Sequence, residues 1–104
     1  MERSIKPDAL KSELPGKYIL DVRRVADHHA STEQLAGAHW KDPEKLSIWA
    51  ASLPRNQDII LYCVRGGGVS NSVVDALQAQ GLSARFIEGG IEGWKAVGGA
   101  VVAK

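Results

Sequence analysis

Three short apolar runs constrain the fold more strongly than any other feature of this chain. They are rich in β-branched and aromatic residues: "YILDV" (Tyr18 to Val22), "IILYC" (Ile59 to Cys63) and "ARFIE" (Ala84 to Glu88). None alternates strictly between apolar and polar residues, which is typical of strands buried on both faces of a parallel sheet. "GAHW" (Gly37 to Trp40) is a shorter candidate for a fourth strand.

Helical patterns fall between these runs. Pro7 suits the first position of a helix, and Asp42 is a candidate N-cap for a second one. The four predicted helices cover Lys6 to Leu14, Asp42 to Pro54, Ser70 to Gly81 and Gly90 to Gly99. Because strands and helices alternate along the chain, the sequence predicts an α/β fold with a small open, mostly parallel sheet flanked by helices.

Length and charge limit the classes of function. The 104 residues are enough for one compact domain and too few for two, so we expect a single domain over residues 1–104. The formal net charge is only +1 and the basic residues are scattered, so we expect neither nucleic acid nor a membrane as a partner. No stretch approaches the roughly 18 apolar residues of a membrane span, and the N-terminus lacks the apolar core of a signal peptide. We therefore expect a cytoplasmic protein.

Cys63 is the only cysteine in the chain. It excludes an intramolecular disulfide and a cysteine-based zinc cluster, and we expect no metal and no cofactor. In a reducing compartment Cys63 is a free thiol. The longest region without an assigned element runs from Arg23 to Ala38, and a long loop in so small a domain is expected close to a site.

The residues after Cys63 predict an anion-binding loop. Three glycines follow the strand end, at positions 66 to 68, and we expect a helix to begin near Ser70 or Asn71. Ligands bind at the carboxyl ends of parallel strands, and a glycine-rich turn into a helix aims backbone N–H groups at an anion. A sulfur held there is stabilised as the nucleophilic thiolate, or as a persulfide. Arg65 is expected to attract a small sulfur-containing anion. The alternative is a buried structural thiol, which such a context disfavours.

Other glycine-rich motifs fit the sequence less well. A nucleotide P-loop needs Lys-Ser/Thr where this chain has Val69-Ser70. A dinucleotide fingerprint over Gly66, Gly68 and Asn71 lacks its third glycine, although an acidic residue does follow about 20 residues later. A cysteine-phosphatase loop has an arginine at the sixth position after the cysteine, where Val69 stands.

Four segments together resemble a rhodanese-like domain. In order they are "YILDVR", "LAGAHW", "IILYCVRGGGVS" and "FIEGGIEGWKAVG", and the resemblance extends from about Ile5 to Val101. It implies a sulfurtransferase in which Cys63 takes sulfane sulfur from a donor such as thiosulfate and passes it to cyanide or to a thiol acceptor, with protein thiols among the candidates. The residues expected to bind the sulfur-containing anion are Val64, Arg65, Gly66, Gly67, Gly68, Val69 and Ser70.

Polar residues near other strand ends are candidates for ordering this loop. Asp21 ends a strand and Arg23 follows it, so either the two order the loop or they form a purely structural pair. Glu88 follows the last predicted strand, and we expect its neighbours Gly89 and Gly90 to turn tightly beside the Cys63 loop. These residues are expected to act through the loop because strand ends of a parallel sheet converge.

Two departures from the family pattern leave alternatives open. The family segment G-H-I-x-G-A lacks its histidine, with His39 placed after the Gly-Ala pair, and the Cys63 loop carries Gly68 and Val69 where Arg, Thr or Ser are common. The sequence therefore also allows a persulfide carrier or redox sensor without turnover, or an oxyanion reductase or phosphatase on the same scaffold. The loop also resembles a rhodanese subgroup found near chromate-resistance proteins.

Overall fold

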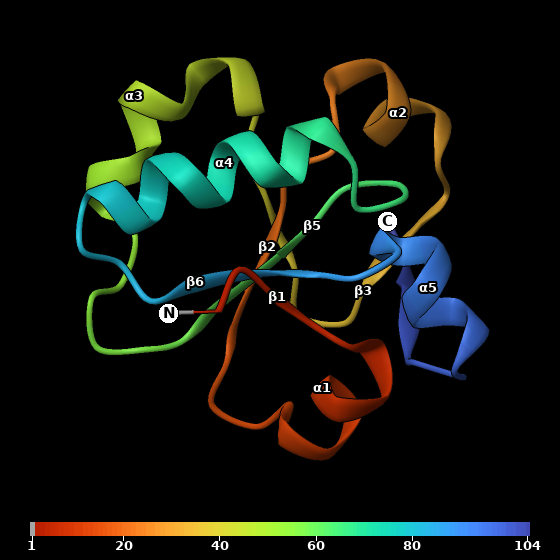
Figure 1. The fold of residues 1–104 in the computed structure, drawn as a ribbon. Helices are drawn as coiled ribbons and strands as arrows, with labels where there is room; N and C mark the ends of the chain where they lie inside the picture. Colours follow the sequence, from red (N-terminus) through yellow and green to blue (C-terminus); the bar gives the residue numbers. More distant parts are fainter. Residues whose placement is uncertain (1) are drawn as a thin grey trace.

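The computed structural model describes residues 2–104 and contains a five-stranded sheet in which every strand pairing is parallel. The three apolar runs form its central strands, and the short run that ends at Trp40 forms one edge (Figure 1). The α/β fold with a small parallel sheet is therefore confirmed. Across the sheet the strands are β1 (Ser4–Ile5), β6 (Ala84–Ile87), β5 (Ile59–Tyr62), β2 (Tyr18–Asp21) and β4 (His39–Trp40).

Helices cover both faces of the sheet, which gives three layers (Figure 1). One face carries α3 (Leu46–Trp49) and α4 (Gly68–Ala79), and the opposite face carries α1 (Pro7–Glu13) and α5 (Gly90–Ala96). All four residues of β5 are buried, because alternate side chains enter opposite cores. This explains why the apolar runs lack a polar/apolar alternation.

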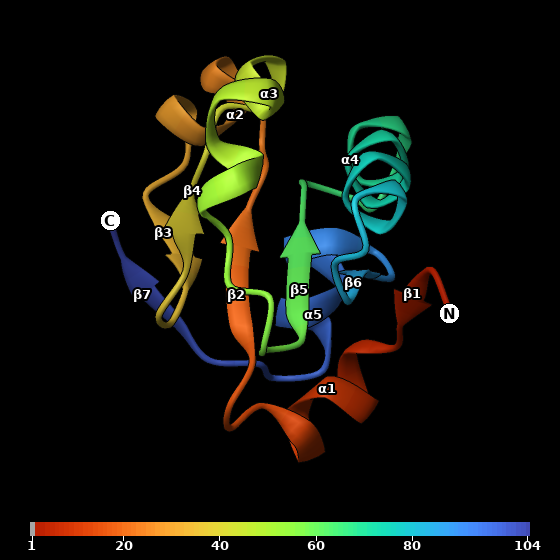
Figure 2. The ribbon, with the colours of Figure 1, turned by 90° about the vertical axis from the view of Figure 1, so that its left-hand side faces the viewer.

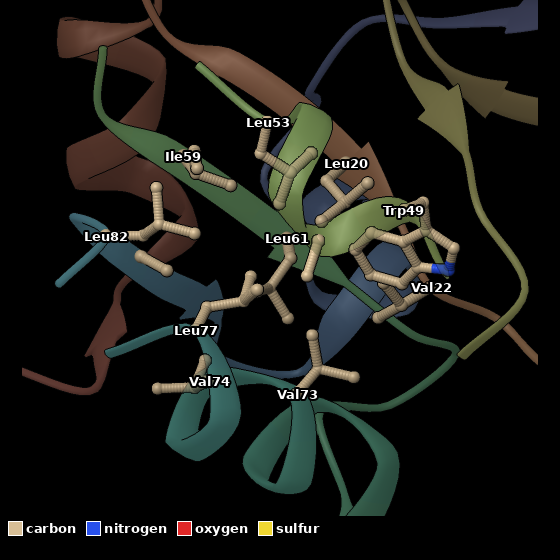
Figure 3. Close-up of a cluster of buried hydrophobic side chains, with 12 residues drawn as sticks. Leu20, Val22, Trp49, Leu53, Ile59, Leu61, Val73, Val74, Leu77 and Leu82 are labelled. Atoms are coloured by element: carbon tan, nitrogen blue, oxygen red, sulfur yellow. The ribbon is translucent and has the colours of Figure 1, made fainter. Parts of the chain in front are cut away.

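The core beneath α3 and α4 is the larger of the two clusters (Figure 3). Leu20 and Leu61 of the sheet contact it from one side, and Val73 and Leu77 of α4 from the other. Trp49 closes its end close to Val22 (Figure 3). This packing fixes where α4 begins relative to the end of β5, and so it positions the loop between them.

The segment from Asp42 to Pro54 is not the single helix that its apolar spacing predicts. It forms a 3₁₀ turn, a short α-helix and a second 3₁₀ turn: η1 (Pro43–Lys45), α3 and η2 (Ala50–Ser52). The expected N-cap is confirmed, because Asp42 Oδ1 accepts a hydrogen bond of 3.0 Å from the Glu44 N–H. In the sequence, Leu46, Trp49, Ala50 and Leu53 are spaced as one apolar helical face. Trp49, Ala50 and Leu53 are buried, so this face is correct although the backbone winds more tightly.

The long region that the sequence left unassigned contains two elements. They are α2 (Val25–Ala30) and β3 (Glu33–Leu35), and β3 pairs antiparallel with β7 (Val101–Ala103) in a small second sheet. β3 and β7 have three residues each, too few for a periodic pattern, and their pairing joins distant parts of the chain. α4 also differs from expectation, since it begins at Gly68 and not near Ser70 or Asn71. Among residues 2–104, no helix has the length and apolar character to cross a membrane.

Candidate active site

Cys63 lies at the edge of the sheet where several strands end. Strands β2, β4 and β5 all point toward the side of the molecule that holds α2 (Figure 2). Cys63 follows β5 directly, and α4 begins five residues later. Its side chain is only 8% exposed, but it opens into a hollow of about 430 Å³, here called the inner hollow. The other residues lining the inner hollow are Arg24, Asp27, Val64, Arg65, Gly67, Gly68 and Val69.

The first turn of α5 fixes the orientation of the loop. The Ile91 N–H donates to the Cys63 carbonyl at 3.0 Å, and the Glu92 N–H donates to the Val64 carbonyl at 3.2 Å. In a trans peptide the N–H points away from the carbonyl of the same peptide unit. The N–H of Arg65 therefore points away from α5, and it is one of the groups that stabilise the Cys63 sulfur.

Two glycines allow this close approach. Gly90 has φ +60°, and a Cβ there would lie 2.4 Å from the Cys63 carbonyl oxygen. Gly66 has φ +72°, and a Cβ there would lie 3.0 Å from the Gly89 nitrogen. Any other residue would meet backbone atoms at either position. The expected tight turn of Glu88, Gly89 and Gly90 beside the Cys63 loop is therefore present.

Hydrogen-bond donors surround the sulfur. The Gly66 N–H donates to Cys63 Sγ at 3.2 Å. Burial by itself raises the pKa of the Cys63 thiol, but the Ser70 hydroxyl and the N–H groups of Gly67, Arg65 and Gly66 lower it further than burial raises it. The pKa of Cys63 is thus below that of an ordinary cysteine, which increases the fraction of nucleophilic thiolate at neutral pH.

Ser70 makes a separate contribution to this environment. Its side chain is fully buried, and its hydroxyl has no hydrogen-bond partner of good geometry among residues 2–104. A buried hydroxyl without a partner costs about 1–3 kcal/mol. The group that gains from its presence is the Cys63 sulfur, whose pKa it lowers. Ser70 therefore keeps a free donor in place for a negatively charged sulfur.

Asp21 and Arg23 form a closed network beneath the loop. Both side chains are buried, and Arg23 binds both carboxylate oxygens of Asp21, with the shortest contact at 2.7 Å. Tyr62 donates to Asp21 Oδ2 at 3.0 Å, and Arg23 Nη2 donates to the Glu33 carbonyl at 3.0 Å. The network joins the ends of β2 and β5 to β3. The network includes Tyr62, the residue before Cys63, but among the described residues no hydrogen bond joins Asp21 or Arg23 to the sulfur.

Tyr62 is a member of this network that the sequence analysis did not single out. The Leu35 N–H donates to its hydroxyl at 3.3 Å. Burial and the negative charge of Asp21 raise the pKa of Tyr62, so its hydroxyl stays protonated and keeps donating to Asp21. The sequence signal that could have identified Tyr62 is a phenol inside the otherwise apolar run "IILYC".

Glu88 and Arg65 lie in different places relative to the sulfur. The structure does not bring the Glu88 carboxylate to the sulfur, because it accepts a hydrogen bond of 2.8 Å from the Ser4 hydroxyl in another hollow. Arg65 is exposed at the inner hollow, where its side chain forms no ion pair with a described residue.

Arg24 and Asp27 also line this hollow. They come from the region that the sequence placed near a site without naming residues. Within residues 2–104 no group of three or more metal-ligating side chains occurs.

Comparisons with known proteins identify the family. The sequence profile of the Rhodanese-like domain matches residues 6–97. The chain belongs to the rhodanese-like domain family. Its fold is similar to that of a rhodanese-related protein from Thermoplasma volcanium, with 27% identity, a TM-score of 0.86, and coverage of 97% of this chain and 98% of that chain. A rhodanese-like domain from Anabaena sp. gives 29% identity, a TM-score of 0.80, and coverage of 100% of this chain and 81% of that chain.

A larger protein shares the same fold. Thiosulfate sulfurtransferase from Pseudomonas aeruginosa is 24% identical, with a TM-score of 0.79. The match covers 98% of this chain and 19% of that chain, so this rhodanese-like domain corresponds to one part of the larger molecule. A comparison with curated proteins finds no match.

Proposed function

We propose that this rhodanese-like domain is a sulfurtransferase that carries sulfane sulfur on Cys63. The observation that carries the proposal is the donor ring at the buried sulfur: the Gly66 N–H donates to Sγ at 3.2 Å, and the Ser70 hydroxyl and the N–H groups of Gly67 and Arg65 also lower the pKa of the thiol. They lower the pKa of a thiol that burial alone would raise. A structural cysteine gains nothing from such a ring, whereas a nucleophile and its persulfide both carry negative charge there.

The first half-reaction takes sulfur from a small anionic donor such as thiosulfate. The Cys63 thiolate attacks the outer sulfur of thiosulfate, and a new S–S bond forms. The bond between that sulfur and the sulfite group breaks, and sulfite leaves with the electron pair. Arg24 and Arg65 line the inner hollow and attract the doubly charged donor, and among the described residues of the lining Asp27 is the single opposing carboxylate.

The second half-reaction returns the enzyme to its thiolate form. A thiol or cyanide acceptor attacks the outer sulfur of the persulfide, and Cys63 leaves as a thiolate. A leaving thiol of lower pKa departs faster, so the same donor ring assists both halves of the cycle. Free thiols persist in the cytoplasm, where we propose that the domain works. The fold shared with a protein named thiosulfate sulfurtransferase supports the choice of donor.

The test is the intact mass of the protein after incubation with thiosulfate, with Cys63→Ser as the matched control. We expect the wild type to gain one sulfur atom that a thiol removes, and the variant to gain none. Thiocyanate production with cyanide then measures turnover. A wild-type protein that takes no sulfur from thiosulfate or polysulfide, while Cys63 still alkylates quickly at neutral pH, would contradict the proposal. Sulfur uptake without turnover would identify a persulfide carrier instead.

A further inference from the structure

A second hollow adjoins the one that contains Cys63. It has a volume of about 490 Å³ and shares Arg24, Gly68 and Val69 with the inner hollow. We call it the outer hollow. Its remaining lining residues are Pro43, Glu44, Ser72 and Val73, so it runs from the first turns of α4 to η1. Each hollow is within the size range of small-molecule sites, and together they form one cleft that ends at the sulfur.

Four charged side chains line this cleft: Arg24, Arg65 and Asp27 at the inner hollow, and Arg24 and Glu44 at the outer one. The side chains of Arg24 and Glu44 are both exposed, and neither forms an ion pair or hydrogen bond with another described residue. Arg24 lines both hollows, whereas Glu44 lines only the outer one. The inner hollow holds two cations against the single described carboxylate of Asp27, so the surplus positive charge lies nearest Cys63 and the carboxylate of Glu44 lies farther out. Val69, Val73 and Pro43 add apolar surface to the outer hollow.

We propose that the outer hollow is a subsite for the sulfur acceptor, and that this acceptor is a small peptide-like thiol. Its carboxylate lies close to its sulfur and binds Arg24, and its ammonium lies farther away and binds Glu44. This order of charges matches a cysteine at the C-terminus of a short peptide. The inference rests on the proposed function, because it assigns the subsite to the second half-reaction.

The transfer step is balanced without any further reactant. The thiolate of the bound peptide attacks the outer sulfur of the Cys63 persulfide, and a new S–S bond forms on the peptide. The bond between Cys63 Sγ and the outer sulfur breaks, and its electron pair stays on Cys63 as the thiolate. The buried Ser70 hydroxyl and the Gly66 N–H stabilise that leaving thiolate. The proton that the peptide thiol gives up on forming its thiolate goes to the outer sulfur of the anionic persulfide and leaves with the peptide product.

Disulfide exchange tests the subsite independently of sulfur transfer. Mixed disulfides of thionitrobenzoate are prepared with glycylcysteine, its N-acetyl form, its amide and the form blocked at both ends. The Cys63 thiolate attacks the peptide sulfur, and the better leaving group, thionitrobenzoate, is released and read by its colour. Cysteinylglycine serves as the peptide with the reversed order of charges. Each rate is measured in the wild type, Arg24→Gln, Glu44→Gln and the control Lys45→Gln.

We expect glycylcysteine to react fastest, with each blocked charge lowering the rate by about two- to fivefold at low ionic strength. Glu44→Gln should remove only the advantage of the ammonium, and Arg24→Gln only that of the carboxylate. Lys45→Gln should match the wild type, since Lys45 is beside Glu44 in η1 but lines neither hollow. Cysteinylglycine should react more slowly than glycylcysteine.

Equal rates for all peptides in the wild type would overturn the subsite, as would equal slowing of charged and blocked peptides in both variants. Either result would point to an acceptor that binds elsewhere, such as a protein thiol. Exchange needs only a reactive thiolate, whereas sulfur loading needs the proposed function. A protein that shows the peptide preference but never gains sulfur would retain the subsite and lose the proposed function.

Discussion

Tyr62 and Cys63 are adjacent in the sequence but have opposite surroundings. The Tyr62 hydroxyl lies beneath the sheet edge against the carboxylate of Asp21, and burial and that charge raise its pKa. Burial also raises the pKa of Cys63, but the donors of Ser70, Gly67, Arg65 and Gly66 reverse its effect and lower it. Successive residues of an extended chain face opposite sides, so the single step from Tyr62, the last residue of β5, to Cys63 separates the two environments.

The difference teaches how to separate supporting polar groups from reactive ones. Around Tyr62 each described polar group has its partner, and the network of Asp21 and Arg23 is closed. Around Cys63 the donors converge on a sulfur that opens into a hollow, and the Ser70 hydroxyl has no other partner of good geometry. Closed networks hold the fold, whereas donors that converge on one ionisable atom are available for chemistry.

Breaking the closed network should cause the largest loss of stability. Asp21→Asn keeps the shape of the side chain but leaves the buried charge of Arg23 uncompensated, which should cost about 3–5 kcal/mol of unfolding free energy. Denaturant unfolding measures the change. Lys95→Gln, which breaks the exposed ion pair with Glu33, is the control and should change stability little. Equal losses of unfolding free energy in the two variants would show that breaking the buried ion pair costs no more than breaking the exposed one.

Gly90→Ala should damage both regions at once. The substitution places a Cβ against the Cys63 and Val64 carbonyls in a left-handed conformation, at a cost of about 1–2 kcal/mol for the conformation and a further 1–3 kcal/mol for the overlap. The free energy of unfolding and the alkylation rate of Cys63 should both decrease. Gly68→Ala is the matched control, because φ is not positive there and a Cβ meets open space. Similar losses in the two variants would refute the role of the α5 contact.

Tyr62→Phe should affect stability without affecting the sulfur. Removing the hydroxyl leaves the Leu35 N–H and one oxygen of Asp21 without this partner, at a cost of about 1–3 kcal/mol near neutral pH. Above about pH 10 the unfolded chain ionises its tyrosine while the folded chain does not, so the wild type should lose this advantage as the pH rises. Unfolding at several pH values measures it. The pH profile of Cys63 alkylation should stay unchanged, and a shifted profile would show that the two environments are coupled.

Ser70→Ala, in contrast to Tyr62→Phe, should shift the alkylation profile of Cys63 and should cause the smallest loss of stability of these variants. It removes a donor that lowers the pKa of Cys63, so the pKa should rise and alkylation should require a higher pH. Because the buried hydroxyl has no other partner, its removal should not lower the unfolding free energy at neutral pH. Ser72→Ala, an exposed position in the same helix, is the control for the alkylation profile. An unshifted profile in Ser70→Ala would remove Ser70 from the donor ring.

Much of the fold was predictable from local patterns. The three apolar runs became β2, β5 and β6, and the helices that begin at Pro7 and Gly90 formed where cap and turn residues indicated. The short strands β1, β3 and β7 were not predicted, because two or three residues show no period and their partners lie far away in sequence. The segment after Asp42 revealed its apolar face but not its 3₁₀ turns.

The sequence by itself determined that Cys63 follows a strand and enters a glycine-rich turn before a helix. This is a local matter, because the strand, the turn and the helix are contiguous in the chain. Only the tertiary structure decided which groups converge on the sulfur and on the cleft beside it. The α5 contacts that orient the loop, and the charges of Arg24 and Glu44, come from segments that meet only when the two cores pack against the sheet.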